Sequence, residues 1–228
     1  MRIVIPYAAF LITAASGCSE SDVPAPSCEA GDSAAHNGQY ELAVEALSDC
    51  LALPLQSDST RANALQVRAW SYSNLGNAPA AVADQEAAFK LQQPTAYGEF
   101  INYATYLRRV GRTQESLDAV LAAEQIEAGA VSMMTQYQKG WSLLELGRNA
   151  EAVKAFTKGI PVQPDYPFVY WRRGLAYEGL GDKRLAKEDF EQCARLLDSK
   201  EKLDAAGAYL PAIRAKLREY GLDARYPL

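Results

Sequence analysis

The sequence predicts an all-α protein in which about five helix-turn-helix repeats stack in a row and a C-terminal helix caps the last one. Two observations predict this fold. A glycine with similar neighbours recurs at intervals of 34 to 38 residues, and the apolar residues around it are spaced by multiples of three and four, the period of one helix face. One helix pair cannot bury its own apolar face, so we expect successive pairs to share a continuous core.

The composition is that of a folded protein with a substantial core. The chain has 228 residues, of which 49% are hydrophobic and 22% are charged, enough for one or two domains. Its formal net charge is −5. Because no basic excess is available to displace counterions from phosphates, the sequence argues against a nucleic-acid partner.

The N-terminus predicts export from the cytoplasm. The apolar run from Ile3 to Ile12 follows a single arginine and is too short to span a bilayer, which needs about 20 apolar residues. We therefore interpret residues 1–17 as a signal peptide.

A lipid anchor is predicted at the end of this signal. The stretch Ala15-Ser16-Gly17-Cys18 resembles the lipobox of bacterial lipoproteins, which implies cleavage before Cys18 and lipidation of that cysteine. Ser19 after the cysteine resembles an outer-membrane sorting signal, so the resemblance implies an outer-membrane lipoprotein facing the periplasm. Cleavage after Gly17 by an ordinary signal peptidase is the alternative. Residues 18–26 are polar and proline-containing, as in a flexible tether.

The repeat region is expected to occupy residues 27–198. The repeats are placed at about 27–54, 60–94, 97–128, 131–164 and 165–198. Their turn glycines share a small residue seven positions before and another twelve positions after, which lets two helices approach closely; these glycines are Gly38, Gly76, Gly111, Gly147 and Gly181. Pro54, Pro94 and Pro164 are expected to stop the second helix of their repeats, because proline cannot continue a helix without losing a hydrogen bond.

Two segments carry a family resemblance. WSLLELGRNAEAVKAFTKGIPVQP, from Trp141, and WRRGLAYEGLGDKRLAKEDFEQCARLL, from Trp171, resemble the tetratricopeptide repeat, and weaker copies extend the resemblance to about 27–197. The resemblance implies a right-handed superhelical solenoid. It also implies that the first helix of each repeat lines a concave groove that holds a protein or peptide.

The C-terminal region, residues 199–228, is expected to hold the cap and a short tail. An array of repeats needs an end with a polar outer face. The stretch from Leu203 predicts one amphipathic helix that ends at Gly221, with Pro211 at its start or at a kink.

Three cysteines remain after Cys18. Cys28 and Cys50 lie on the two helices of the first repeat, and their midpoint falls at its turn, so we expect them to face each other and form a disulfide. The alternative is that Cys50 only fills the small buried position that Ala88 fills in the next repeat. Cys193 occupies the same position without a counterpart and is expected to be a buried, unreactive thiol.

No motif for catalysis or metal binding is visible. His36 is the lone histidine, which argues against a zinc site or a catalytic triad, and we expect it near the turn in a solvated position. The adjacent carboxylates Glu188 and Asp189 are interpreted as part of a solvated outer face. The sequence therefore predicts no enzyme, no cofactor, no metal and no small-molecule substrate.

The family resemblance implies a set of groove residues at fixed distances from the turn glycines. In this sequence they are Gln66, Trp70, Asn74, Ile101, Thr105, Arg108, Arg109, Tyr137, Trp141, Trp171 and Leu175. All three tryptophans then fall on one surface, where aromatic side chains are typical binding anchors. The alternative is that they belong to the core, because Tyr170 and Trp171 are adjacent and a small helix rotation would exchange them.

These features predict a non-catalytic adaptor or scaffold that is tethered to a membrane and binds a protein or peptide in its groove. The resemblance to repeat-containing lipoproteins implies roles in envelope, pilus or secretion assembly. The alternative is a structural homo-oligomer that uses the aromatic patch as its own interface.

Overall fold

The described part of the chain, residues 26–54 and 57–227 of a computed structural model, is built of helices and contains no strand. These residues fall into two compact units, which we call the N-terminal unit, up to Arg112, and the C-terminal unit, from Thr113. The sequence boundary between them lies within the third predicted repeat. The predicted signal peptide and Cys18 lie outside the described residues.

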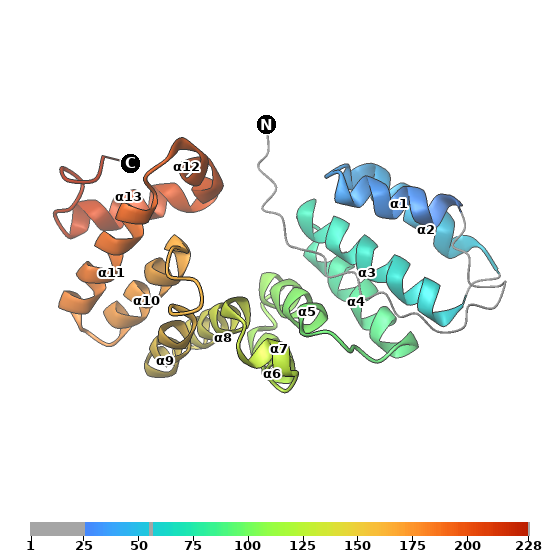
Figure 1. Cartoon of the computed structure of the whole chain (residues 1–228), viewed down its shortest axis with the longest axis horizontal. Coiled ribbons are helices and arrows are strands. Elements are labelled where there is room, and N and C mark those ends of the chain that lie inside the picture. The colour runs from blue at the N-terminus through green and yellow to red at the C-terminus, as the bar shows by residue number, and fades with distance from the viewer. Residues whose placement is uncertain (1–25, 55–56, 228) are drawn as a thin grey trace. The chain divides into compact units, whose positions relative to one another are not determined.

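The N-terminal unit consists of two helical hairpins and one further helix (Figure 1). In chain order these are α1 (Pro26–His36), α2 (Tyr40–Ala52), α3 (Asp58–Asn74), α4 (Ala78–Leu91) and α5 (Tyr97–Arg109). The α1–α2 hairpin buries mostly small residues, including Ala35 and Ala43. Cys28 of α1 and Cys50 of α2 are both buried, and their Sγ atoms lie 2.02 Å apart, at bonding distance.

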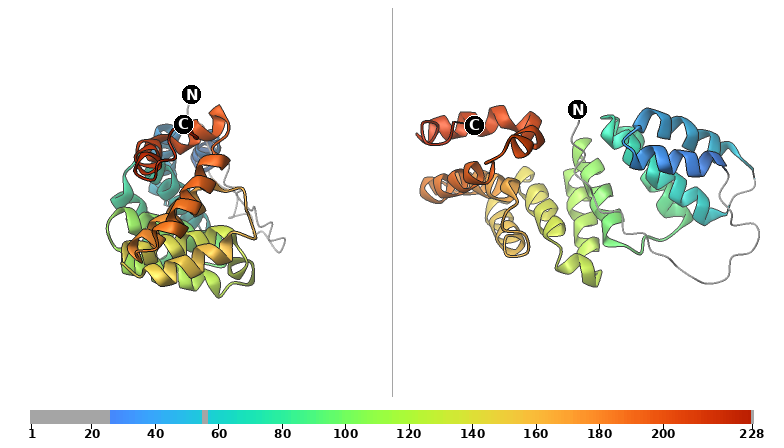
Figure 2. Two further views of the ribbon diagram at one scale, coloured as in Figure 1. Left: turned by 90° about the vertical axis from the view of Figure 1, so that its left-hand side faces the viewer. Right: turned by 45° about the horizontal axis from the view of Figure 1, so that its top comes forward.

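The C-terminal unit consists of two helices that follow Arg112, two further hairpins and a terminal segment (Figure 2). Its helices are α6 (Thr113–Glu124), α7 (Glu127–Ala130), α8 (Met133–Glu145), α9 (Asn149–Gly159), α10 (Pro167–Gly179) and α11 (Lys183–Leu196). The short helix α7 was not expected from the sequence. Pro167 occupies the first turn of α10, where its missing N–H and fixed φ favour helix initiation.

The five turn glycines have the same backbone conformation. Their φ angles lie between 72° and 82°, a left-handed region that other residues rarely adopt. At Gly181 the glycine N–H donates to the carbonyl of Glu178, and the next N–H, of Asp182, donates to the carbonyl of Tyr177 at 2.9 Å. This is a Schellman cap, which satisfies carbonyls at the helix end and turns the chain into the next helix.

The two helices of a repeat approach most closely at the small residue seven positions before the turn glycine. A Cβ added at Gly174 would lie 2.6 Å from Cε1 of Phe190, and one added at Gly140 would lie 2.5 Å from Cε1 of Phe156. Both phenylalanines are fully buried. The absence of a side chain on the first helix therefore makes room for an aromatic ring on the second.

The size of the two facing residues varies in a compensating way. Where the first position is alanine, as at Ala69, the facing position nine residues after the turn glycine holds the more flexible Gln85. Protein interiors are packed about as densely as crystals of small molecules. A larger residue on one helix therefore requires a smaller residue at the facing position of the other helix.

A largely buried ion pair joins the two helices of the last hairpin, and its arginine also reaches the preceding hairpin. The guanidinium of Arg173 on α10 donates to both carboxylate oxygens of Asp189 on α11 at 2.8 Å, and its Nη1 donates to Thr157 Oγ1 on α9 at 3.0 Å. The prediction that Asp189 lies on a solvated face is therefore wrong, since it is 5% exposed, whereas its neighbour Glu188 is exposed.

The same arrangement occurs in the N-terminal unit. Arg68 on α3 donates to both oxygens of Asp84 on α4 at 2.7 and 2.9 Å, and its Nη1 donates to Ser48 Oγ on α2. Both arginines lie eight residues before the turn glycine and both aspartates lie eight after it. The arginine thus links its own hairpin to the preceding one.

The C-terminal cap differs from the single helix that the sequence predicts. It consists of α12 (Lys200–Ala206), a 3₁₀ turn η1 (Gly207–Tyr209) and α13 (Leu210–Glu219). Gly207, with a φ of 37°, separates the two helices, and Pro211 lies in the first turn of α13. Among the described residues, no helix is both long enough and apolar enough to span a bilayer.

We predict that Gly174→Ala lowers the free energy of unfolding by about 2 kcal/mol, because the added methyl group overlaps the rigid ring of Phe190. Chemical denaturation followed by circular dichroism measures this change. The matched control is Gly98→Ala in the first turn of α5, where no atom lies within 4 Å of the added Cβ, and it should be neutral or slightly stabilising.

The double variant Gly174→Ala/Phe190→Val adds a methyl group at the first position and removes the aromatic ring that faces it. It should cost less than the sum of the two single changes, because the smaller valine relieves the overlap. Additive costs would show that the two positions do not pack against each other.

Candidate partner-binding site

Five aromatic rings of the C-terminal unit form a closed cycle of contacts. We call this set the aromatic ring cluster: Tyr137, Trp141, Tyr209, Phe168 and Tyr166, in the order in which neighbouring rings touch. The centroids of neighbouring rings are 5.3 to 6.3 Å apart, with edge-to-face or tilted geometry. Such pairs add favourable electrostatic contacts to the burial of their large apolar surface.

Arg172 lies against this cluster. Its Cζ is 3.0 Å from the centroid of Trp141, 5.5 Å from that of Tyr209 and 5.9 Å from that of Tyr137. The residue is only 7% exposed, and its Nε donates a hydrogen bond to Tyr137 Oη at 2.9 Å. The cluster therefore combines a buried positive charge with aromatic faces that stabilise a cation.

Helical spacing brings these side chains together. Tyr137 and Trp141 are four residues apart on α8, and Phe168 and Arg172 are four apart on α10, so each pair shares one helix face. Tyr209 is supplied by η1, the turn that follows Gly207. The site is thus built from the first helices of two consecutive repeats and from the C-terminal segment.

The rim of the cluster faces solvent. Tyr209 is 39% exposed, Trp141 and Tyr166 are half-buried, and Tyr137 and Phe168 are buried. The indole Nε1 of Trp141 donates to Glu145 Oε1 at 2.7 Å, which fixes the orientation of the ring. Partly exposed, rigid aromatic side chains bind partners at low entropic cost, so this arrangement is suited to recognition.

Of the predicted groove residues in the C-terminal unit, the structure places Tyr137 and Trp141 in the cluster and Trp171 outside it. Trp171 is 5% exposed and its ring lies 5.3 Å from that of Phe190. The expectation that all three tryptophans lie on one open surface is therefore wrong, because Trp171 belongs to the core. Leu175, one turn further along α10, is half-buried.

Trp70 anchors a smaller aromatic group in the N-terminal unit. Its ring lies 5.5 Å from that of Tyr40 and 6.2 Å from that of His36. His36 is exposed, as expected, and its Nδ1 lies 2.8 Å from the carbonyl oxygen of Asp32. Ile101 is 3% exposed and so does not contribute an open groove surface.

The polar groove residues of the N-terminal unit mostly bind neighbouring parts of the same unit. Gln66 donates to Glu99 at 2.7 Å, and Arg109 donates through Nη1 to the carbonyl and hydroxyl of Ser73. The remaining three are Asn74, which is exposed, and Thr105 and Arg108, which are half-buried.

Four members of this site are not among the residues predicted from the sequence: Arg172, Tyr166, Phe168 and Tyr209. The positions transferred from the repeat family do not include them. A signal was nevertheless present, because aromatic residues are dense from Tyr166 to Trp171 and Phe168 has the i,i+4 relation to Arg172.

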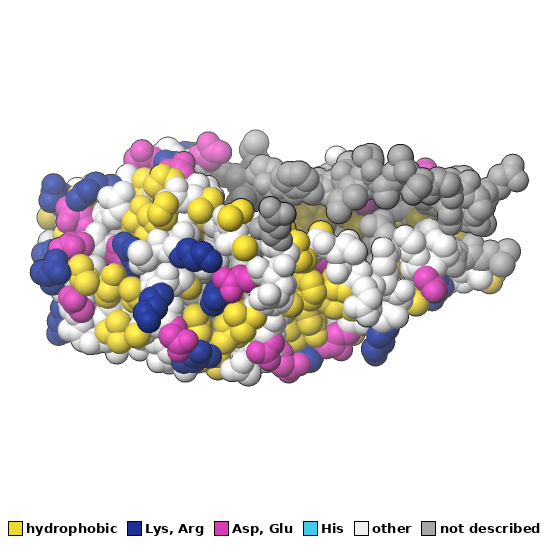
Figure 3. All heavy atoms as spheres, turned by 60° about the horizontal axis from the view of Figure 1, so that its bottom comes forward, with side chains coloured by type: hydrophobic (Ala, Val, Ile, Leu, Met, Phe, Trp, Pro, Cys, Tyr) yellow, Lys and Arg dark blue, Asp and Glu magenta, His cyan; other side chains and the backbone are white. Residues whose placement is uncertain are grey.

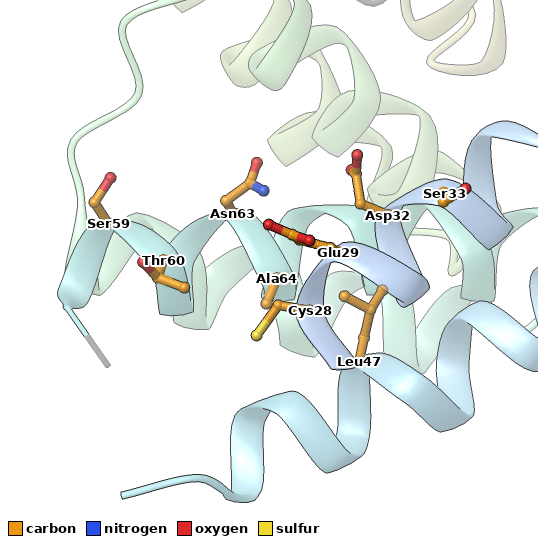
Figure 4. A pocket seen from close by; sticks show the side chains of 9 residues that line it. All are labelled: Cys28, Glu29, Asp32, Ser33, Leu47, Ser59, Thr60, Asn63 and Ala64. Atoms are coloured by element: carbon orange, nitrogen blue, oxygen red, sulfur yellow. The ribbon is translucent and has the colours of Figure 1, made fainter. Parts of the chain in front are cut away.

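A polar pocket of about 390 Å³ lies beside the first hairpin. Figure 4 shows Glu29 and Asp32 of α1 on one side and Ser59, Thr60 and Asn63 of α3 on the other. No group of three or more potential metal ligands occurs in the part of the chain that the structure describes. The carboxylates, hydroxyls and amide of this lining offer polar contacts to a ligand.

A second pocket, of about 400 Å³, lies between α6, α8 and α9. Burial raises the pKa of its Glu124, but hydrogen bonds from Lys139 and Gln136 outweigh this effect and hold the pKa below its usual value. Across the face of the C-terminal unit in Figure 3, basic and acidic side chains are interspersed. This face therefore lacks the continuous positive surface that nucleic acids require.

Cys193 lies in the core of the C-terminal unit and is a free thiol. Burial raises its pKa to about 12. Because the thiolate is the reactive form, this cysteine is unreactive in the folded chain.

These features define an array of helix-turn-helix repeats with an aromatic surface on its first helices. The family model described as Tetratricopeptide repeat matches residues 135–166 and 169–200. Residues 135–200 therefore hold two tetratricopeptide repeats, and the predicted all-α fold class is confirmed. Proteins with this repeat are generally interaction modules without catalytic activity.

Solved structures agree with this assignment. A crystal structure of MamA protein has 22% sequence identity and a TM-score of 0.63, over 77% of this chain and 92% of that chain. YrrB, described as a TPR protein with an unusual peptide-binding site, has 17% sequence identity and a TM-score of 0.64. The match covers 82% of this chain and 93% of the YrrB chain. At these identities the likeness shows the fold alone. No curated protein sequence matches the chain.

We predict that Trp171→Ala lowers the free energy of unfolding by about 4 kcal/mol, the cost of a large cavity in the core. Tyr209→Ala, at the exposed rim, should cost less than about 1 kcal/mol. Denaturant unfolding of the two variants compares them directly, and similar costs would contradict the division into core and rim.

Proposed function

We propose that the protein is a non-catalytic adaptor that binds a protein or peptide at the aromatic ring cluster. The observation that carries this proposal is the closed cycle of five rings with a buried arginine against it, built on the first helices of two consecutive repeats and on η1. The repeat fold supports it, because tetratricopeptide repeats are interaction modules. The peptide-binding site named for YrrB, which has a similar fold, gives further support.

We also propose that the adaptor works at a membrane surface. The lipobox-like residues before Cys18 support lipidation and an outer-membrane position facing the periplasm. Tethering would raise the effective concentration of any captured partner and strengthen weak contacts. Envelope, pilus or secretion assembly are the processes in which such a tethered adaptor would act.

Replacement of the exposed rings should abolish partner capture. We expect the double variant Trp141→Ala/Tyr209→Ala to bind partners from native envelopes at least about tenfold less strongly, because both rings are partly exposed anchors. The matched control is Val131→Ala/Val162→Ala, which removes two exposed apolar side chains of the same unit outside the cluster. Quantitative mass spectrometry of the captured proteins compares the variants, and equal capture by both would contradict the proposal.

Light scattering of the same variants tests the homo-oligomer alternative. An oligomer of the natural chain that becomes a monomer in Trp141→Ala/Tyr209→Ala would show that the cluster is a self-interface.

The lipid anchor has its own test. Cys18→Ser should move the protein from the membrane pellet to the soluble fraction, because it removes the residue that carries the acyl chains. Ser19→Ala, the neighbouring control, should leave the protein in the pellet. Continued sedimentation of Cys18→Ser with membranes would contradict lipidation.

A further inference from the structure

We infer that Arg172 binds the side-chain carboxylate of a glutamate in the partner peptide, while the rings of the aromatic ring cluster hold the methylene groups of that glutamate and an apolar neighbour. This inference rests on the proposed function and specifies the chemistry of the partner.

The first observation is a charge without a counterion. Arg172 is 7% exposed, and within the described residues its hydrogen bonding is limited to the one from Nε to Tyr137, with no carboxylate within ion-pair distance of it. Removal of a charged group from water is costly unless the charge is paired. The two terminal nitrogens therefore retain most of their capacity to bind an anion.

Other arginines of the chain show what this one lacks. Arg68 and Arg173, at the position just after that of Arg172 in the repeat register, each donate two parallel hydrogen bonds to an aspartate. Arg112 pairs with Glu86 at 2.8 Å. Arg68, Arg173 and Arg112 thus each have a carboxylate partner, whereas Arg172 has none among the described residues.

The surroundings of the guanidinium restrict how a ligand reaches it. The ring of Trp141 covers one face of the guanidinium, with its centroid 3.0 Å from Cζ of Arg172. The Nε–H group already donates its hydrogen bond to Tyr137 Oη. An incoming group must therefore approach the two terminal nitrogens close to the guanidinium plane. A carboxylate fits this approach, because its two oxygens accept parallel hydrogen bonds from an arginine.

The depth of the site favours glutamate over the end of a peptide chain. Arg172 is almost fully buried, whereas Tyr209 at the rim is 39% exposed. A peptide backbone would remain at the rim, and a glutamate side chain carries its carboxylate inward on two methylene groups. The rings of Trp141 and Tyr209, whose centroids lie 3.0 and 5.5 Å from Cζ of Arg172, would contact those methylene groups.

Matched synthetic peptides test the inference on the full-length chain. The probe is acetyl-Gly-Phe-Glu-Phe-Gly-amide, its counterpart has glutamine in place of glutamate, and a third peptide, acetyl-Gly-Phe-Phe, carries a free C-terminal carboxylate. Titrations follow the indole N–H resonance of Trp141 by nuclear magnetic resonance, assigned with Trp141→Phe. We expect the glutamate peptide to bind at least about tenfold more tightly than the other two, the effect of a charge-assisted hydrogen-bonded pair.

A glutamate peptide that binds no better than the glutamine peptide overturns the inference, and so does a preference for the free C-terminus. Both comparisons use the natural chain, so they do not depend on the folding of any variant.

Substitution of Arg172 gives a second readout. In Arg172→Met the preference for glutamate should disappear, while the melting temperature stays the same or rises because an unpaired buried charge is removed. Arg184→Gln, which removes an exposed arginine paired with Glu188 on α11, is the control and should keep the preference. Retention of the glutamate preference in Arg172→Met overturns the inference.

The two proposals fail in different ways. If glutamate and glutamine peptides bind equally but binding still requires Trp141 and Tyr209, the adaptor function stands and the role of Arg172 is wrong. If envelope partners bind regardless of Trp141 and Tyr209, the proposed site itself is wrong.

Discussion

The close approach of the two helices in each repeat is the constraint on which the rest of the structure depends. At Gly140 and Gly174 the first helix has no side chain, so the rings of Phe156 and Phe190 fill the space and are fully buried. The left-handed glycine at each turn then holds the helices in this antiparallel arrangement. Since the ring occupies the gap between the helices, the outer positions of the first helix are left for other contacts. The aromatic ring cluster uses these positions on α8 and α10.

Two neighbouring arginines on α10 show how the same side chain serves different purposes. Arg173 is matched in charge and geometry by Asp189 and also reaches Thr157 on the preceding hairpin, so it ties consecutive repeats together. Arg172, one residue earlier, lies on the other side of the helix among aromatic rings that stabilise its charge only in part. Arg173 therefore finds its counterion within the fold. An arginine whose counterion comes from elsewhere is what a recognition site requires.

The repeats could be predicted from the sequence because each depends on local and recurrent signals. Turn glycines, small residues at fixed offsets and helical apolar spacing all repeat, so five weak copies support one another. The site was harder to predict. Tyr170 and Trp171 are adjacent, yet both are buried, since α10 is covered on several sides. The position of Tyr209 depends on a break at Gly207, inside a segment whose apolar pattern favours one continuous helix. Neither feature follows from the period of the repeat.

The origin of Tyr209 has a consequence for how specificity can change. Most rings of the aromatic ring cluster come from the repeats, where a substitution must preserve the packing between hairpins. The ring of Tyr209 comes from η1 in the terminal segment. That segment lies beyond the last turn glycine of the array and is free of its spacing rules. Substitutions in η1 can therefore change the rim of the aromatic ring cluster without disturbing the packing between the hairpins.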